Sequence, residues 1–285
     1  MTNTSLDISG KLDAEMLEII EPLISVCART DVEILLVGAV ARDIHFRHVH
    51  GMDPDQAPMD VDFEVLVPSR DACDEVMRKI TRDGVCTQDD FVGHRVHTPA
   101  GIVFDLIPFS EIDEAEGQLS WPPDFDHVMS TIGFKDAFDS ALVCRVKAQP
   151  PLEIRILSIP GMAVLKLIAW ADGDSHRSKH AIDFRLILEN YDAVQIDRLF
   201  SEEENLIDLV NSEYEMAVAQ LLGRDAGKMM TTDTRQAVLD ILEEELRVDG
   251  PLRLVGDMLA DSVQGADYVL AQLTNFRQGI VDASA

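Results

Sequence analysis

The sequence predicts an α+β protein, with a mixed β-sheet head over residues 1–158 and a helical C-terminal domain over residues 159–285. In the first part, short apolar runs of strand length alternate with helical patterns. After Pro160, a residue that suits a first helical position, apolar side chains recur at helical spacing almost to the end of the chain. The 285 residues are ample for a packed core.

The first part begins with a helix predicted over residues 12–28, in which Pro22 marks a kink or a break. The run VEILLVG (32–38) predicts a short buried strand that ends in glycine, and AVARDIHFRHV (39–49) predicts a helix. Residues 50–58 are polar, contain two prolines and predict a loop.

Residues 59–65 alternate apolar and acidic side chains, which predicts a strand over 59–67 with one buried face. Ser69 is then the expected cap of a helix that runs to about Arg82. The runs GHRVHTP and GIVFDLIPF are separated by a TPAG turn and predict a hairpin. Residues 109–141 are less regular, and strands are expected near 142–147 and 153–157.

The C-terminal domain is predicted to begin with helices formed by GMAVLKLIAWA and RSKHAIDFRLILENY, with a DGDSH turn between them. Further acidic amphipathic helices follow from about 201 to 280, with breaks near Gly223, Gly250 and Gly265.

The chain is strongly acidic, with 24 Lys and Arg against 52 Asp and Glu and a net charge of −28. Such a surface disfavours generic nucleic-acid binding, which depends on neutralising phosphates with Lys and Arg. A polyanionic substrate must therefore meet a local basic patch or a bound cation. Residues 151–200, with 6 basic against 7 acidic side chains, are close to neutral and are the expected place for an anion.

No signal peptide and no membrane-spanning run is recognisable, and four widely spaced cysteines form no CxxC pattern. We therefore expect a cytoplasmic protein with reduced thiols that does not enter a membrane.

Two aspartates two residues apart, Asp60 and Asp62, are unusual in a strand because Asp is depleted there. A third, Asp105, lies in the apolar run IVFDLIPF, where an unpaired carboxylate would be expensive to bury. Together they offer the hard oxygen ligands that Mg²⁺ prefers, and two such ions support in-line displacement at a phosphate. For Asp105 alone, a structural ion pair or a hairpin-edge position is an equally good interpretation.

The segment LLVGAVARDI places Gly38 at a strand end just before a helix. Free N–H groups and the positive end of the helix dipole collect at such a turn, so it favours phosphate. Arg42, one turn into the helix, is placed to reach a phosphate oxygen.

A glycine turn, then a D-x-D strand, then a third Asp resembles the DNA polymerase β-like nucleotidyltransferase superfamily. The segments DVDFEV, FDLIPF, GFKDAF, SIPGMAVLKLIAW, RSKHAIDFRLILENY and LLGRDAGKM are most similar to bacterial nucleotidyltransferases of the AbiEii/AbiGii toxin type. The resemblance covers roughly residues 30–230 in detail.

The resemblance implies a nucleotidyltransferase head that moves a nucleoside monophosphate from an NTP, with Mg²⁺ or Mn²⁺ held by Asp60, Asp62 and Asp105. It also implies that Lys166 and Asp183 complete the nucleotide site with Gly38, Ala39 and Arg42. Ala39 departs from the Gly or Ser usual in the superfamily. A lysine at a solvent-facing helix flank is the alternative for Lys166, and a surface pair with Lys179 is the alternative for Asp183.

Histidines in HFRHVH (His45, His48, His50) and HRVH (His94, His97) follow no zinc pattern such as HExxH, and a dedicated histidine metal site is not expected.

The activity that the resemblance implies is a Mg²⁺-dependent nucleotidyl transfer. It also implies that the chain is the toxin of a toxin–antitoxin pair, with an antitoxin protein as its partner. The acceptor is a tRNA, a protein or a small molecule. The alternative is a catalytically weak protein of the same fold that acts as a partner-binding module.

Overall fold

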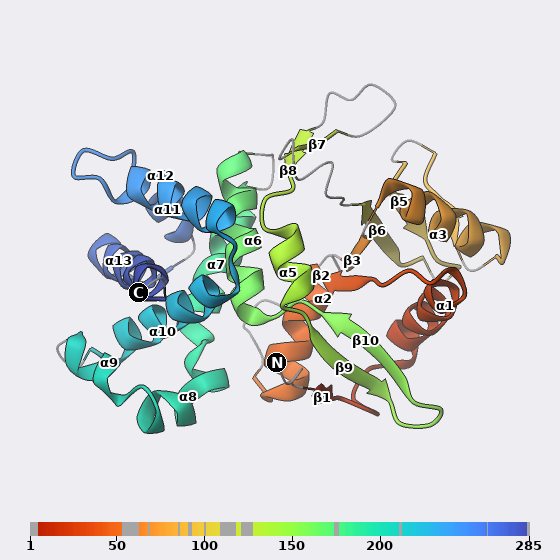
Figure 1. The fold of residues 1–285 in the computed structure, drawn as a ribbon, viewed down its shortest axis with the longest axis horizontal. Helices are drawn as coiled ribbons and strands as arrows, with labels where there is room; N and C mark the ends of the chain where they lie inside the picture. The colour runs from red at the N-terminus through yellow and green to blue at the C-terminus, as the bar shows by residue number, and fades with distance from the viewer. Residues whose placement is uncertain are drawn as a thin grey trace. The chain divides into compact units, whose positions relative to one another are not determined.

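The computed structural model describes residues 5–52, 63–67, 69–84, 86–90, 93–99, 101–108, 118–120, 128–173, 177–210, 213–260 and 262–283 (Figure 1). Contacts between Cα atoms divide the chain into two compact units, Met1–Ser158 and Ile159–Ala285. Among the described residues, all strands lie in the first unit, and the second unit is helical.

Within the described part of the first unit, eight strands form one mixed sheet in the order β1-β9-β10-β2-β3-β6-β5-β4. The pairs β1–β9, β10–β2 and β3–β6 are parallel and the others are antiparallel. The strands span Ser5–Asp7 (β1), Leu35–Val37 (β2), Phe63–Val67 (β3), Thr87–Gln88 (β4), Arg95–His97 (β5), Val103–Pro108 (β6), Leu142–Lys147 (β9) and Leu152–Ile156 (β10). A separate hairpin pairs β7 (Gln118–Ser120) with β8 (Val128–Ser130).

The predicted strands near 32–38, 142–147 and 153–157 are confirmed as β2, β9 and β10. The strand predicted over 59–67 is confirmed as β3 for Phe63–Val67, and residues 59–62 lie outside the described residues. The β2 residues Leu35, Leu36 and Val37 are all buried, as expected for a central strand with both faces covered. The predicted hairpin is confirmed as β5 and β6. Strand β1 was not predicted, because its partner strand β9 is distant in the sequence.

The helices of the first unit are α1 (Ala14–Thr30), α2 (Gly38–Asp43), the π-helix η1 (Ile44–Val49), α3 (Arg70–Arg82) and α5 (Phe134–Asp139). Ser69 caps α3 as predicted, because its Oγ accepts a hydrogen bond from the Ala72 N–H at 3.1 Å. Helix α1 is continuous through Pro22, so of the two predicted alternatives, a kink or a break, the break does not occur. Helix α5 lies within the stretch that the sequence marked as less regular.

The described helices of the second unit are α6 (Ile159–Asp172), α7 (Arg177–Asn190), α8 (Asp192–Ser201), α9 (Glu204–Leu209), α10 (Tyr214–Met229), α11 (Thr232–Leu246), α12 (Arg253–Met258) and α13 (Ala266–Asp282). The predicted helices after Pro160 and Asp174 are confirmed as α6 and α7. Both helices have extensively buried faces, and Phe184 packs edge-to-face on Phe276 with ring centroids 5.3 Å apart.

Helices α10 and α13 lie side by side and form the closest helix pair of the second unit (Figure 1). A Cβ atom added at Gly223 would lie 2.0 Å from the carbonyl oxygen of Phe276, and one at Gly279 would lie 2.0 Å from that of Gln220. Gly223 therefore lets two backbones approach, and the helix break predicted there is wrong. The breaks near Gly250 and Gly265 are confirmed, since α11 ends before the first and α13 begins after the second.

Charged side chains bind one another along one end of the second unit. Asp225 accepts hydrogen bonds from the Tyr191 hydroxyl at 2.6 Å and from Arg198 at 2.6 and 2.7 Å. Arg198 and Arg224 both contact Glu203, at 3.3 and 2.7 Å. These contacts join α8 to α10 and to Tyr191 and Glu203, the residues just after α7 and just before α9. Among the described helices, none is both long and apolar enough to cross a membrane.

Candidate functional site

The predicted phosphate-binding turn joins β2 directly to α2. Gly38 is the first residue of α2 and has a φ of +72°, a left-handed conformation that glycine adopts without the strain of a Cβ atom. Val37, the N-cap residue, provides no side-chain hydrogen bond to the first turn of the helix. The structure thus places Gly38 at a strand end just before a helix, as the sequence predicted, and adds that its backbone conformation favours glycine.

The two other predicted residues of this turn are largely buried. Ala39 is 7% exposed and Arg42 is 6% exposed. The Nη2 and Nε atoms of Arg42 lie 3.3 and 3.4 Å from Oδ1 of Asp43, which is the long end of the hydrogen-bond range. Arg42 therefore lies inside the turn beside a carboxylate of its own helix.

Asp105 lies on β6 between β3 and β5. The parallel register pairs it with Glu64 on β3, and the antiparallel register pairs it with Arg95 on β5. Arg95 donates from Nε to Oδ1 at 2.8 Å and from Nη2 to Oδ2 at 2.9 Å, a two-bond fork that fixes the carboxylate. His94 Nε2 lies 3.9 Å from the same Oδ2. The ion pair that was the alternative interpretation of Asp105 is thus present.

The other two predicted metal ligands, Asp60 and Asp62, lie outside the described residues. Across the part of the chain that the structure describes, no group of three or more His, Cys, Asp or Glu side chains gathers as metal ligands do. Asp105 fits a divalent ion in its donor chemistry, because Mg²⁺ and Mn²⁺ prefer carboxylate oxygen. It is 19% exposed, so the carboxylate is partly accessible, and it shares both oxygens with Arg95.

Lys166 and Asp183, the two residues predicted from the second unit, lie together. Lys166 is on α6, Asp183 is on α7, and Nζ of the lysine lies 2.7 Å from Oδ2 of the aspartate. Their side chains are 17% and 9% exposed, so this is a largely buried ion pair. A lysine that extends to solvent from a helix flank is therefore not what the structure shows.

The histidines serve structural roles where the structure describes their partners. His45 is buried, and its Nε2 lies 2.8 Å from the carbonyl oxygen of Leu157, which requires the nitrogen to donate. Burial lowers the pKa of His45 to about 4, so the ring is neutral at pH 7. His97 Nε2 lies 2.7 Å from Asp89. His94 and His97 thus lie next to different carboxylates, Asp105 and Asp89.

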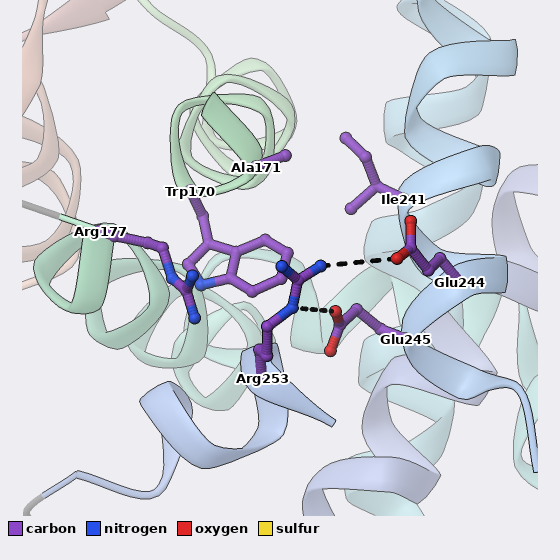
Figure 2. Close-up of a pocket in the computed structure, with 7 residues that line it drawn as sticks. All are labelled: Trp170, Ala171, Arg177, Ile241, Glu244, Glu245 and Arg253. Carbon is purple, nitrogen blue, oxygen red and sulfur yellow. Dashed lines mark hydrogen bonds and ion pairs between the residues drawn. The ribbon is translucent and has the colours of Figure 1, made fainter. Parts of the chain in front are cut away.

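A small cavity in the second unit is lined by Trp170, Ala171, Arg177, Ile241, Glu244, Glu245 and Arg253 (Figure 2). Its volume of about 100 Å³ is below the roughly 300–1,000 Å³ of typical ligand pockets. Figure 2 shows the Trp170 indole next to Arg253, which contacts Glu245 at 3.4 Å and Glu244 at 3.6 Å. Because Arg253 is paired with Glu244 and Glu245, we interpret the cavity as part of the packing between these helices and not as a ligand site.

Sequence reasoning missed Arg95, although the hairpin contained the signal. With the turn placed at TPAG, antiparallel pairing sets residue 97 opposite 103 and residue 95 opposite 105. Counting across the turn would have put a basic side chain opposite the third aspartate.

Comparison with known proteins gives one family match and one structural likeness. The family model described as "Nucleotidyl transferase AbiEii toxin, Type IV TA system" matches residues 58–253. The solution structure of the antibiotic-resistance factor ANT(2'')-Ia has 12% identity and a TM-score of 0.40, covering 71% of this chain and 98% of that chain. At a TM-score of 0.40, this likeness does not assign a fold or a function to the chain. None of the curated proteins searched matches this chain.

Proposed function

Because this chain belongs to the AbiEii nucleotidyltransferase toxin family of type IV toxin–antitoxin systems, we propose that it transfers a nucleoside monophosphate from an NTP to an acceptor with Mg²⁺ or Mn²⁺. Family membership gives the reaction class, nucleotidyl transfer, and the toxin–antitoxin setting. The metal, the residue roles, the acceptor and an antitoxin partner are the parts that we propose. The observation that carries the residue assignment is the position of Asp105, paired across the sheet with residue 64 of β3.

The proposed metal ligands are Asp60, Asp62 and Asp105. In the sequence, Asp62 precedes Glu64 by two residues, and the alternating pattern of 59–65 assigns both to one strand face. Asp105 is in register with Glu64, so the predicted pattern brings the third aspartate to the same neighbourhood. When bound, divalent ions would activate the attacking hydroxyl and neutralise charge on the leaving pyrophosphate.

The residues proposed to bind the nucleotide are Gly38, Ala39, Arg42, Lys166 and Asp183. Backbone N–H groups at a glycine turn bind phosphate oxygens, and Arg42 adds a permanent positive charge. Asp183 orients the Lys166 ammonium through their 2.7 Å contact. A charge held in one place binds an anion with less loss of side-chain entropy than a free lysine would. Asp183 is thus proposed to position Lys166 toward the triphosphate.

The proposed acceptor is one of three classes: a tRNA 3′ end, a protein hydroxyl or a small molecule such as an aminoglycoside. A net charge of −28 repels a long polyanion, so binding to a tRNA would involve a small contact area near its end.

The experiment that tests the proposal incubates the protein with each α-labelled NTP and Mg²⁺, in the presence of total tRNA, cell extract or an aminoglycoside. Labelled product identifies the nucleotide and the acceptor class together. Asp62→Asn should abolish the transfer. The control Asp71→Asn makes the same substitution at an exposed aspartate on α3 and should leave the transfer unchanged.

The second candidate is a catalytically weak, partner-binding module. Two observations favour it: Ala39 replaces the usual glycine or serine, and Arg95 occupies both oxygens of Asp105. The same assay separates the two functions. Absence of label transfer to every acceptor, together with no NTP-dependent rise in the melting temperature, would leave the binding module as the better account.

A further inference from the structure

Two consecutive helices of the second unit, α8 and α9, expose large apolar side chains. Ile196, Phe200 and Leu209 are 46%, 52% and 61% exposed. We call these three residues the α8–α9 surface. Single exposed apolar side chains are normal on proteins, but three within fourteen residues on helices that pack together are a feature that needs a physical reason.

Phe200 is held in its exposed position by its neighbours. Its ring stacks on Tyr214 at the start of α10, with centroids 6.0 Å apart and planes 14° apart. The Tyr214 hydroxyl in turn donates to Asp192 on α8 at 3.2 Å. Ile196 is four residues before Phe200, which places it on the same side of the helix. The Phe200 ring is therefore held in place before a partner binds, which reduces the side-chain entropy lost on binding.

The same segment is strongly acidic. Residues 192–215 contain eight Asp and Glu and a single basic residue, Arg198. Arg198 is engaged by Asp225 and Glu203, so its charge is balanced inside the unit. Asp197 and Glu202, close in sequence to Phe200, are exposed, as is Asp208 beside Leu209. The α8–α9 surface thus combines apolar anchors with carboxylates around them.

We propose that the α8–α9 surface docks a cationic amphipathic segment of a partner protein, in which apolar side chains are flanked by Lys or Arg. The negative charge of this surface distinguishes between the possible binding partners. A second copy of this chain, also at −28, would be repelled, and so would nucleic acid or an anionic membrane. A cationic segment satisfies both features, because its apolar side chains cover the apolar anchors and its charges pair with the surrounding carboxylates.

The test uses three labelled synthetic helices and fluorescence anisotropy with the full chain. One helix has a leucine stripe flanked by lysines, the second replaces the lysines by glutamates, and the third replaces the leucines by serines. Only the first should bind, and its affinity should fall as salt is raised. Phe200→Ser and Ile196→Ser should each weaken binding about tenfold or more, as expected for central apolar anchors. Val248→Ser, which changes a fully exposed valine on another segment, should leave binding unchanged.

The charge contribution has its own matched control. The triple variant Asp197→Asn/Glu202→Gln/Asp208→Asn should weaken binding and its salt dependence. A control variant with the same charge change, Asp233→Asn/Asp240→Asn/Asp249→Asn, alters exposed acids outside the α8–α9 surface and should bind like the original chain.

Two results would overturn the proposal. Equal loss of binding in both triple variants would mean that overall acidity attracts the peptide. A dimer in sedimentation that dissociates in Phe200→Ser would assign the α8–α9 surface to a second copy of the chain.

Discussion

Arg95 and Asp105 face each other across the β5–β6 hairpin and form two hydrogen bonds, at 2.8 and 2.9 Å. The pair joins the aspartate of the proposed metal site to a cation that uses the same two oxygens. A divalent ion and a guanidinium repel each other, so the two compete for this carboxylate. If Asp105 binds metal as proposed, Arg95 is expected to lower the affinity of that site for the ion.

Replacing Arg95 by Gln should lower the metal concentration needed to saturate the protein, because the competing charge is removed. Stability should fall by only about 0.5–1 kcal/mol, since the arginine side chain is 41% exposed and such pairs are worth little. Thermal shift during Mn²⁺ titration measures the first effect, and urea unfolding measures the second. Arg145→Gln breaks a similar cross-strand pair with Glu153 and serves as the control. An identical change in metal affinity in both variants would contradict the competition.

Lys166→Met should destabilise the second unit by about 3 kcal/mol, because Asp183 would lose its cationic partner in a largely buried place. The double variant Lys166→Met/Asp183→Leu should be more stable than Lys166→Met, since it removes both charges from the interior. Urea unfolding of the two single variants and the double variant gives the coupling energy. A coupling energy near zero would show that the 2.7 Å contact does not stabilise the protein.

Gly223→Ala should destabilise the packing of α10 on α13 by about 3 kcal/mol or more, because the new Cβ atom would lie 2.0 Å from a backbone oxygen that cannot move alone. The control is Gly256→Ala on α12, where an added Cβ meets nothing within 4 Å. That change should stabilise the protein by roughly 0.5–1 kcal/mol, as alanine does inside a helix. Thermal unfolding of both variants decides the matter, and equal melting temperatures would refute the close-approach argument.

His45 should make stability fall as the pH is lowered from about 6.5 to about 4. Its pKa in the folded chain is about 4 against 6.5 for the free side chain, mainly because burial disfavours the charged ring. In that pH range the unfolded chain binds the proton and the folded chain does not. The free energy of unfolding therefore falls by about 3 kcal/mol between pH 7 and pH 4. His45→Gln removes this titration while its amide keeps a donor for Leu157. The measurement is the difference in unfolding free energy between the two proteins at pH 7 and at pH 4.5, and a constant difference would contradict the assignment.

The elements that the sequence predicts well are those whose pattern is local. The alternation of 59–65, the apolar run of 32–38 and the Ser69 cap each follow from neighbouring residues. Strand β2 and helix α3 confirm the second and third, and β3 confirms a strand over Phe63–Val67, the part of the first that the structure describes. Strand β1 escaped prediction because three residues acquire their structure only by pairing with β9. Gly223 was misread for the same reason, since its role depends on Phe276, more than fifty residues away.

The candidate site shows the same limit. Residue type and the strand pattern singled out Asp105. The family resemblance, not spacing, implied Lys166 and Asp183 together, and the structure places their charged atoms 2.7 Å apart. Spacing alone left open whether Asp105 pairs with a cation, because that depends on which strand lies beside β6. The β5–β6 register answers it with Arg95, and the metal roles of Asp60 and Asp62 stay predictions.

The most direct test of the nucleotidyltransferase assignment is the rate of Mg²⁺-dependent label transfer by Asp105→Asn relative to the original chain, both shown to be folded. The asparagine preserves shape and removes one negative charge from the proposed metal site. We predict a rate at least about 100-fold lower, the usual effect of losing a group that stabilises the transition state electrostatically. Transfer at the original rate would show that Asp105 serves only its arginine, and that the chemistry is carried elsewhere.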